Sequence, residues 1–201
     1  LAANLQTLAP EEFRNLEVGL KWEPTEELAV NAALFQIDRT NTRATDPNTG
    51  NPVLSGASRT KGFELSLSGK ILANWQASLG YTYQDGEITR TTTAAPAGRS
   101  LDKLPHHQIS AWTRYDLSGA FGIGLGLVHQ SSQFATISNA VRLPAFTRID
   151  AALFYDVSDN LSLQLNVENL TDADYFPSAH TDNNIATGKP LNAKLTARVK
   201  F

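Results

Sequence analysis

The last residues of the chain, LNAKLTARVKF (Leu191–Phe201), form the stretch that decides the fold. An apolar residue occupies every odd position and a polar or charged residue occupies every even position, up to the final phenylalanine. Because successive side chains of a β-strand point to opposite faces, this alternation predicts a strand with one apolar and one polar face. A strand of this kind belongs at the boundary between an apolar and an aqueous environment.

The same period of two recurs along most of the chain. Between 161 and 167, for example, Leu161, Leu163 and Leu165 alternate with Ser162 and Gln164. Nine segments show the pattern, at 16–22, 28–37, 63–68, 76–83, 109–115, 123–127, 148–155, 161–167 and 191–201. No segment shows a convincing helical period, so the sequence predicts an all-β, antiparallel fold.

Composition excludes several classes of protein and site. The chain has 201 residues and a formal net charge of −3, so its charge does not point to nucleic acid. It has no cysteine, which excludes disulfides and thiolate metal sites. No apolar run approaches the ~20 residues of a membrane-spanning helix, but a membrane β-barrel needs none. Because methionine is absent even at position 1, we expect residues 1–201 to belong to a longer protein.

The connections between the predicted strands alternate between short and long. Short connections lie at 23–27, 70–74, 117–120 and 157–160, and long ones lie at 38–59, 86–104, 131–143 and 171–189. Outer-membrane β-barrels have this asymmetry, with short periplasmic turns and longer extracellular loops. The sequence therefore predicts the wall of a transmembrane antiparallel β-barrel.

Aromatic residues sort toward the two ends of the predicted strands. At the short-turn end lie Trp22, Trp75, Tyr115, Phe121, Tyr155 and Phe201. Toward the long-loop end lie Phe35, Phe63, Tyr83, Phe134, Phe146, Tyr175 and Phe176. Aromatic rings favour membrane–water interfaces, so the sequence predicts two girdles. The alternative, a soluble β-sandwich, would place large aromatic residues at mid-strand, where only Trp112 clearly lies.

The polar face of the predicted wall would line a wet lumen. It includes Arg114, Arg148, Asp150, Gln164, Glu168, Asn192, Lys194, Thr196, Arg198 and Lys200. On the lipid face at mid-membrane one Arg or Lys would cost about 2–4 kcal/mol, and no strongly alternating segment places one there. The GIGLG run after Phe121 alternates within a strand, so we expect its glycines to leave room in the lumen rather than to bind phosphate.

Nine strands do not match the even strand number of single-chain bacterial barrels. An open sheet edge in lipid would also leave backbone groups unpaired. We therefore expect the chain to be the last portion of a larger barrel. Its two unpaired edge strands would make the isolated chain prone to aggregation.

Several segments resemble one known family. RNLEVGLKW, TKGFELSLSGK, LPHHQISAWTRYDL and LNVENLTDADYF, followed by the aromatic-terminated strand, are similar to the C-terminal half of TonB-dependent outer-membrane receptors. The segment NLTDADYFPSAHTDNNIATGKPLNAKL resembles the catecholate-type ferric-siderophore receptors. The resemblance implies a 22-stranded barrel around a plug domain, of which residues 1–201 would form the last nine strands.

The resemblance also implies a function and partners. A receptor of this family, in the outer membrane of a Gram-negative bacterium, imports a ferric siderophore and takes energy from TonB through its N-terminal region. Phe201 would end the signal read by the outer-membrane assembly machinery, and the outer face would contact lipid or lipopolysaccharide. The ferric siderophore is then cargo, and no covalently bound cofactor, resident metal or catalytic residue is expected.

Ligand contacts can be proposed from the chemistry of the cargo. A ferric catecholate is anionic and aromatic, so it favours basic side chains and ring faces near the extracellular mouth. The candidates are Arg99, Lys103, His106, Trp112, Arg114, Arg142, His180 and Lys189. For the basic loop residues, contact with lipopolysaccharide phosphate or with water alone is the alternative. The adjacent His106 and His107 are expected on opposite faces of a strand, which argues against a shared metal ion.

Two other functions remain open from the sequence. One is a passive porin or an autotransporter-type barrel, which would have no plug domain upstream. The other is an outer-membrane hydrolase, although the chain has no G-x-S-x-G motif and no paired carboxylates at a defined spacing.

Overall fold

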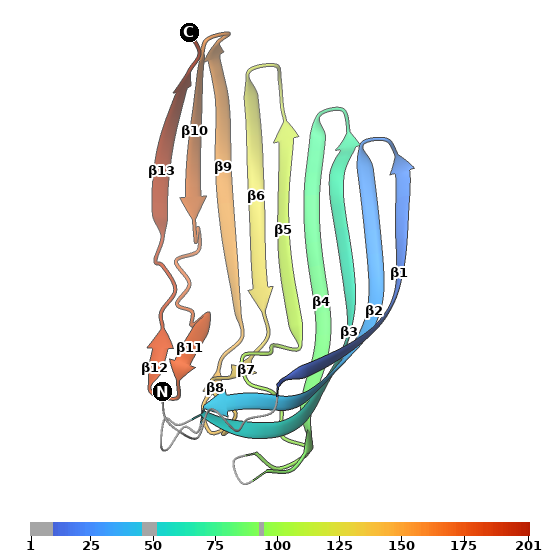
Figure 1. The fold of residues 1–201 in the computed structure, drawn as a ribbon. Coiled ribbons are helices and arrows are strands. Elements are labelled where there is room, and N and C mark those ends of the chain that lie inside the picture. Colours follow the sequence, from blue (N-terminus) through green and yellow to red (C-terminus); the bar gives the residue numbers. More distant parts are fainter. Residues whose placement is uncertain (1–9, 46–51, 93–94) are drawn as a thin grey trace.

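The computed structural model describes residues 10–45, 52–92 and 95–201. In these ranges no helix is long and apolar enough to cross a membrane. Nine strands form one antiparallel sheet, which we call the wall (Figure 1). In sheet order they are β1 (Glu12–Thr25), β2 (Leu28–Thr45), β3 (Pro52–Leu72), β4 (Trp75–Arg90), β5 (His107–Asp116), β6 (Phe121–Gln130), β9 (Phe146–Ser158), β10 (Leu161–Glu168) and β13 (Asn192–Val199).

The wall confirms all nine predicted strands. Each strand pairs with the next sheet strand along the chain, so the topology is a simple meander. The tight turns gather at one end of the wall and the long connections gather at the other (Figure 1). The predicted alternation of short and long connections is therefore confirmed as well.

One predicted loop is largely strand. The sequence predicts a loop over 38–59, but β2 and β3 stay paired as far as Thr45 and Pro52. β4 likewise continues to Arg90, inside the long connection predicted at 86–104. The threonines of this part of β2, such as Thr40 and Thr42, are β-branched and fit a strand. Their polarity hides the strand from a search for apolar alternation.

Two short ribbons lie within the long connections. β7 (Gln133–Phe134) pairs with β8 (Arg142–Leu143), and β11 (Ser178–Thr181) pairs with β12 (Asn184–Ala186). Strands of two to four residues are too short to show a period, so the sequence does not predict them. These ribbons give the long connections a structure of their own.

The register of the wall assigns each side chain to one of two faces. Leu163 pairs with Ala197 on one face, and Gln164 pairs with Thr196 on the other. On interior strands, Leu34, Leu125 and Leu153 are 62%, 52% and 55% exposed, so the residues that the structure describes leave the apolar face uncovered. Such a face is stable against lipid.

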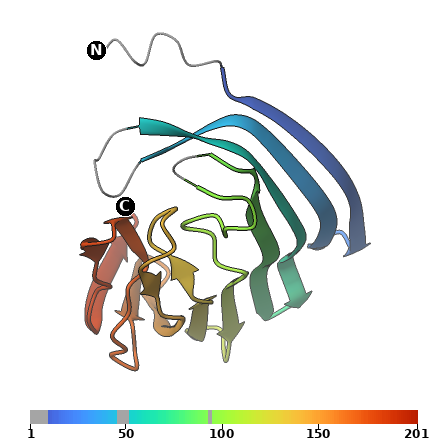
Figure 2. The ribbon, with the colours of Figure 1, turned by 90° about the horizontal axis from the view of Figure 1, so that it is seen from below.

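The polar face is the concave one. The sheet is curved, and the long connections lie within its concave side (Figure 2). Leu101 and Leu104 of the β4–β5 connection lie next to Gly86, which belongs to the polar face of β4. The convex face is therefore apolar and the concave face polar, as in the wall of a membrane barrel with a wet lumen.

The aromatic girdle at the short-turn end is confirmed for the strand residues. Trp75 pairs with Tyr115, and the rings of Phe121 and Tyr155 stack with their centroids 4.4 Å apart. All four rings lie on the apolar face, as does Trp22 at the same end of β1. Phe201 follows β13 at this end and is fully exposed.

The second girdle is mostly wrong. Phe63 and Tyr83 pair directly on the apolar face, as predicted. Phe35 lies on the concave face, where its ring covers Gly62. Phe146 is also on the concave face, against Tyr175, and Phe134 and Phe176 lie in the long connections. Position along a strand does not decide the face; odd or even parity within the strand does.

Candidate functional site

Trp112 and the glycines of β6 form one feature of the concave face. A Cβ atom at Gly124 would lie 2.6 Å from the indole Cζ2 of Trp112, and one at Gly126 would lie 2.8 Å from its Cε3. Only glycine therefore allows the indole to lie flat on β6. The expectation that these glycines leave free room in the lumen is corrected, because the side chain of the neighbouring strand fills it.

Arg114 lies on the same face of β5, one step nearer the short turns. Its guanidinium carbon is 4.2 Å from the centroid of the Phe154 ring, and its Nε donates to Asp116 Oδ1 at 2.8 Å. The cation–π contact and the ion pair hold the side chain against the wall. Trp112 and Arg114 thus lie on the concave face, as predicted from strand parity, and their contact with a ligand stays a prediction.

The long connections pack into a layer at the other end, which we call the loop cap (residues 95–106, 131–145 and 169–191). One small apolar cluster joins β4 to the cap through Ile88, Ala95 and Ile137, with Leu101 beside them. A second cluster joins two of the connections. It contains Ala135, Val141, Leu143, Phe176 and Ala179. Within the described residues, these clusters hold six of the eight buried hydrophobic residues, and the other two are Ala152 and Tyr175.

Polar contacts tie the same connections together. Asp182 accepts hydrogen bonds from Thr136 Oγ1 at 2.8 Å and from Ser138 Oγ at 2.9 Å. Arg99 Nη1 donates to the Ile137 carbonyl at 3.2 Å. Burial raises the pKa of the Asp102 carboxyl, and the nearby charge of Asp182 raises it further, against the opposing effect of Lys103. These side chains therefore join the connections of the cap, together with single backbone bonds such as that from the Lys103 amide to the Phe134 carbonyl at 2.9 Å.

The NLTD segment explains how the last connection leaves the wall. Asn169 is fully buried, and its Nδ2 donates to the carbonyls of Ala173 and Lys189, both at 3.0 Å. Its Oδ1 accepts from the Ala173 amide at 2.9 Å. Asp172 Oδ1 accepts from the Leu191 amide at 2.7 Å. Both residues have a positive φ, of 55° and 49°, which Asn and Asp tolerate better than most residues.

A polar cluster around Arg148 joins the 169–191 connection to the wall. Arg148 Nη2 is 2.9 Å from Asp150 Oδ2, and Nη1 donates to the Tyr175 hydroxyl at 3.3 Å. Glu168 Oε1 lies 3.6 Å from the same Nη1, and Lys189 Nζ lies 3.9 Å from Glu168 Oε2. The Tyr175 ring covers Gly188. The sequence did not predict Tyr175 as a site residue, and its partners come from distant parts of the chain.

Six of the predicted ligand contacts lie in the loop cap. They are Arg99, Lys103, His106, Arg142, His180 and Lys189. Lys103 Nζ is 3.9 Å from Asp102, and the guanidinium carbon of Arg142 is 5.9 Å from the centroid of the Phe134 ring. His180 is exposed on β11. The structure places these residues at one end of the molecule, and Arg99, Lys103 and Arg142 have different neighbours there.

The expected arrangement of the two adjacent histidines is wrong. Both rings lie near Tyr83, with ring centroids 6.5 Å away for His106 and 5.1 Å away for His107. His106 precedes β5, so strand alternation does not govern its side chain. His106 Nδ1 is 3.0 Å from the Gln84 carbonyl, and His107 Nδ1 is 3.0 Å from the Tyr81 hydroxyl. In the described part of the chain, no group of three His, Cys, Asp or Glu residues is placed to hold a metal ion.

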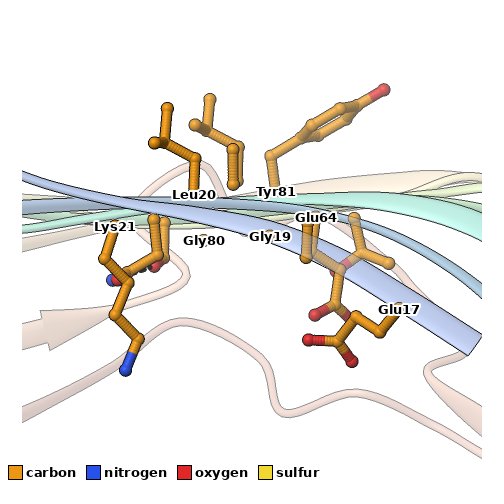
Figure 3. Close-up of a pocket in the computed structure, with 13 residues that line it drawn as sticks. Glu17, Gly19, Leu20, Lys21, Glu64, Gly80 and Tyr81 are labelled. Atoms are coloured by element: carbon orange, nitrogen blue, oxygen red, sulfur yellow. Dashed lines mark hydrogen bonds between the residues drawn. The ribbon is translucent and has the colours of Figure 1, made fainter.

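The concave face carries hollows at both edges of the wall. Near β1, a hollow of ≈ 600 Å³ is bordered by the acidic side chains of Glu17 and Glu64 and by Lys21, which point to one side of the sheet (Figure 3). Leu20 and Tyr81 point to the opposite side. Near β13, a hollow of ≈ 280 Å³ is lined by three basic residues, by Asp156 and by uncharged residues. Its lining includes Arg114, Phe154, Arg198 and Lys200.

Comparison with known proteins gives consistent relatives. Residues 2–170 match the family described as "TonB dependent receptor-like, beta-barrel". The probable TonB-dependent siderophore receptor PiuA of Acinetobacter baumannii is 33% identical, over 99% of this chain and 28% of the relative. The catecholate siderophore receptor Fiu of Escherichia coli K12 is 33% identical, over 100% of this chain and 27% of the relative. The chain thus spans less than a third of the curated relatives it matches.

Solved structures agree with the sequence matches. The crystal structure of PiuA superposes with a TM-score of 0.86 and 30% identity, covering 98% of this chain and 29% of that chain. The closed form of the ferric-catecholate import receptor Fiu superposes with a TM-score of 0.85 and 30% identity, covering 100% and 29%. The match includes the wall and the connections that form the loop cap.

Proposed function

Because the chain belongs to the family of TonB-dependent receptor β-barrels, we propose that it is part of an outer-membrane receptor that imports a ferric siderophore. The observation that carries the proposal is the match over almost the whole chain to two siderophore receptors, in sequence and in structure. Residues 1–201 would form the C-terminal part of the barrel, around a plug domain supplied by the rest of the receptor. Barrels with the fold of its relatives lie in the outer membrane of Gram-negative bacteria, and we propose the same location for this protein.

The proposed cargo is a ferric siderophore of the catecholate class. Fiu is named for this class, and it is as similar to the chain as PiuA is. A ferric catecholate is anionic and aromatic, and the loop cap presents cations to it. The proposed contacts there are Arg99, Lys103, His106, Arg142, His180 and Lys189.

The mechanism needs no covalent step from this chain. The cap would bind the complex first, because its cations lie at the end with the long connections. Below the cap, the wall would present polar side chains to the passing ferric siderophore. Trp112 and Arg114 are held against this face of the wall. TonB would supply the energy through the N-terminal part of the receptor. The relatives are receptors rather than enzymes, which makes a hydrolase the weaker alternative.

Two further partners are proposed for the outer surface and the last strand. The convex face is apolar and would contact lipid, with lipopolysaccharide at the cap end. The aromatic-terminated β13 would be read by the outer-membrane assembly machinery, through Phe201.

The test is uptake of iron by cells that express the receptor as their only route for ferric catecholate. We expect growth on the complex with TonB and no growth when the gene for TonB is deleted. Growth that persists without TonB would favour a passive porin and overturn the proposal. Equal uptake of hydroxamate and catecholate complexes would contradict the proposed catecholate class of cargo but not the receptor function.

A further inference from the structure

The short ribbon of β7 and β8 has two faces of different character. On the inner face, Ala135 and Leu143 are buried and belong to the apolar cluster that includes Ala179. On the outer face Phe134 pairs with Arg142, and Phe134 is half-buried while Arg142 is exposed. The ribbon lies at the end of the wall that carries the long connections (Figure 1). The inner face therefore anchors the ribbon in the cap, and the outer face presents one aromatic ring and one cation.

Arg142 differs from the other lysines and arginines of the cap in its partner. Its guanidinium carbon lies over the Phe134 ring, 5.9 Å from the centroid. By contrast, Arg99 donates to a backbone carbonyl, and Lys103 and Lys189 each lie 3.9 Å from a carboxylate oxygen. In the part of the chain that the structure describes, no carboxylate lies within ion-pair distance of Arg142. Its charge is therefore held by a ring and is not offset by a neighbouring carboxylate.

The connection that carries Arg142 has no negative charge of its own. Residues 131–145 contain no Asp or Glu, and Arg142 is the one Lys or Arg among them. Asp182 reaches this connection from the last one, but both of its carboxylate oxygens accept hydrogen bonds, from Thr136 Oγ1 and Ser138 Oγ. The acidic group that approaches the connection is thus already engaged by two hydroxyls.

A second cation lies beside Phe134, from a different connection. The backbone amide of Lys103 donates to the Phe134 carbonyl at 2.9 Å, which holds the Lys103 backbone next to β7. The Lys103 side chain is exposed, and Asp102 at 3.9 Å offsets part of its charge. Phe134 therefore lies between a segment with a partly balanced cation and a strand with an unpaired one.

These groups match the chemistry of a ferric catecholate, which is both anionic and aromatic. A guanidinium is planar and stacks on aromatic faces, so Arg142 can rest one face on Phe134 and offer the other to a catechol ring. Its N–H groups and the Lys103 ammonium attract the anionic oxygens of the complex. A cargo that is anionic but not aromatic gains the charge attraction alone.

We propose that Phe134 is a positioning residue for aromatic cargo, which holds Arg142 in place to stack against a catechol ring. The sequence predicts Phe134 in a girdle at the membrane interface, whereas the structure gives its ring a cation as partner. The inference rests on the proposed function, because it takes the cap as the surface that receives a ferric siderophore. It goes further by assigning the choice between aromatic and non-aromatic cargo to one ring and one guanidinium.

The test is equilibrium binding of radioactive iron complexes to cells that express the full receptor but lack TonB, so that binding is read without transport. The probes are the ferric complex of a synthetic tripodal catechol chelator and ferric citrate, which is anionic but has no aromatic ring. Phe134→Leu keeps an apolar side chain and removes the ring. We expect it to weaken binding of the catechol complex about tenfold, within the range of a cation–π contact, and to leave the binding of ferric citrate unchanged.

Three further variants separate the ring from its surroundings. Phe134→Tyr keeps a ring and should bind the catechol complex as the unmodified receptor does. Arg142→Lys keeps the charge but removes the planar group, so it should weaken binding of the catechol complex as Phe134→Leu does. Phe63→Leu is the matched control, because it makes the same exchange on the apolar face of the wall and should change neither affinity.

The outcomes distinguish this inference from the proposed function. Unchanged binding of the catechol complex in Phe134→Leu, or an equal loss for both complexes, would overturn the inference without contradicting the proposed function. The same holds if Phe134→Tyr binds as weakly as Phe134→Leu. An unmodified receptor that binds no ferric catechol complex would contradict the proposed cargo and this inference with it.

Discussion

The wall and the loop cap hold their residues by different means. In the wall, each strand is paired along its length, as in β10 and β13, where every residue from Leu161 to Glu168 has a partner. In the cap, the ribbons have only two to four residues per strand. Hydrogen bonds and ion pairs of single side chains hold the connections together there. Asn169, Asp182 and Arg148 each join segments that lie 20 or more residues apart in the sequence. The contacts are Asn169 to Lys189, Thr136 to Asp182 and Arg148 to Tyr175.

This difference predicts where the molecule tolerates substitution. A backbone ladder does not depend on the identity of one side chain, so most changes in the wall should cost little. A buried side chain that satisfies several backbone groups has no substitute, because its loss leaves those groups unpaired. We therefore expect the largest single effects at the junction between wall and cap.

Asn169→Ala should have the largest effect. It leaves the Ala173 amide and the carbonyls of Ala173 and Lys189 without their partner in a fully buried place. We expect a loss of about 3 kcal/mol in the free energy of unfolding, measured by urea titration of the refolded receptor in lipid vesicles. Limited proteolysis should show that the 169–191 connection opens first.

Asn166→Ala is the matched control. Asn166 lies on the concave face of β10, half-buried, and its Oδ1 accepts from Gln164 Nε2 at 2.8 Å. Its removal should cost less than about 1 kcal/mol. Equal losses for the two asparagines would show that cap and wall are not held differently.

Gly124→Ala tests the exception inside the wall. Here one side chain does matter, because the new Cβ would lie 2.6 Å from the Trp112 indole. Displacing the ring should cost about 1–2 kcal/mol, within the usual range for overpacking. Gly80→Ala is the control, since the nearest atom to its new Cβ is the Ser110 carbonyl oxygen at 3.9 Å. A neutral Gly124→Ala with an unchanged tryptophan emission spectrum would contradict the close packing.

The same contrast explains how far the sequence could predict the structure. The wall is predictable because one physical rule, apolar residues on alternate positions facing lipid, is written in every strand. Height along a strand is a weaker guide than parity. It predicts Phe35 in a girdle, whereas the parity of Leu34 and Val30 puts position 35 on the concave face.

The candidate site is less predictable for a different reason. Trp112 and Arg114 follow from strand parity, so their placement on the concave face is confirmed. The segment NLTDADYF can be recognised by its resemblance to the family. The structural role of Asn169, however, depends on its hydrogen bond to the Lys189 carbonyl, 20 positions away. No local pattern encodes such a contact. The packing of the cap likewise depends on small clusters drawn from three connections.

The smallest expected effect is a pH dependence confined to the cap. Burial raises the folded-state pKa of Asp102 above its ordinary value of 3.8, so the folded cap binds the proton more tightly than the unfolded chain does. The stability that this proton contributes is complete below the unfolded pKa and is lost as the pH rises through the raised folded pKa. The cap should therefore resist proteolysis better in acid, by less than about 1 kcal/mol since the side chain is partly exposed. Asp102→Asn should flatten this profile, whereas Asp159→Asn, on a short turn at the opposite end of the wall, should leave it unchanged. Protection that increases with pH in the unmodified protein would contradict the assignment, and with it the claim that single side chains govern the cap.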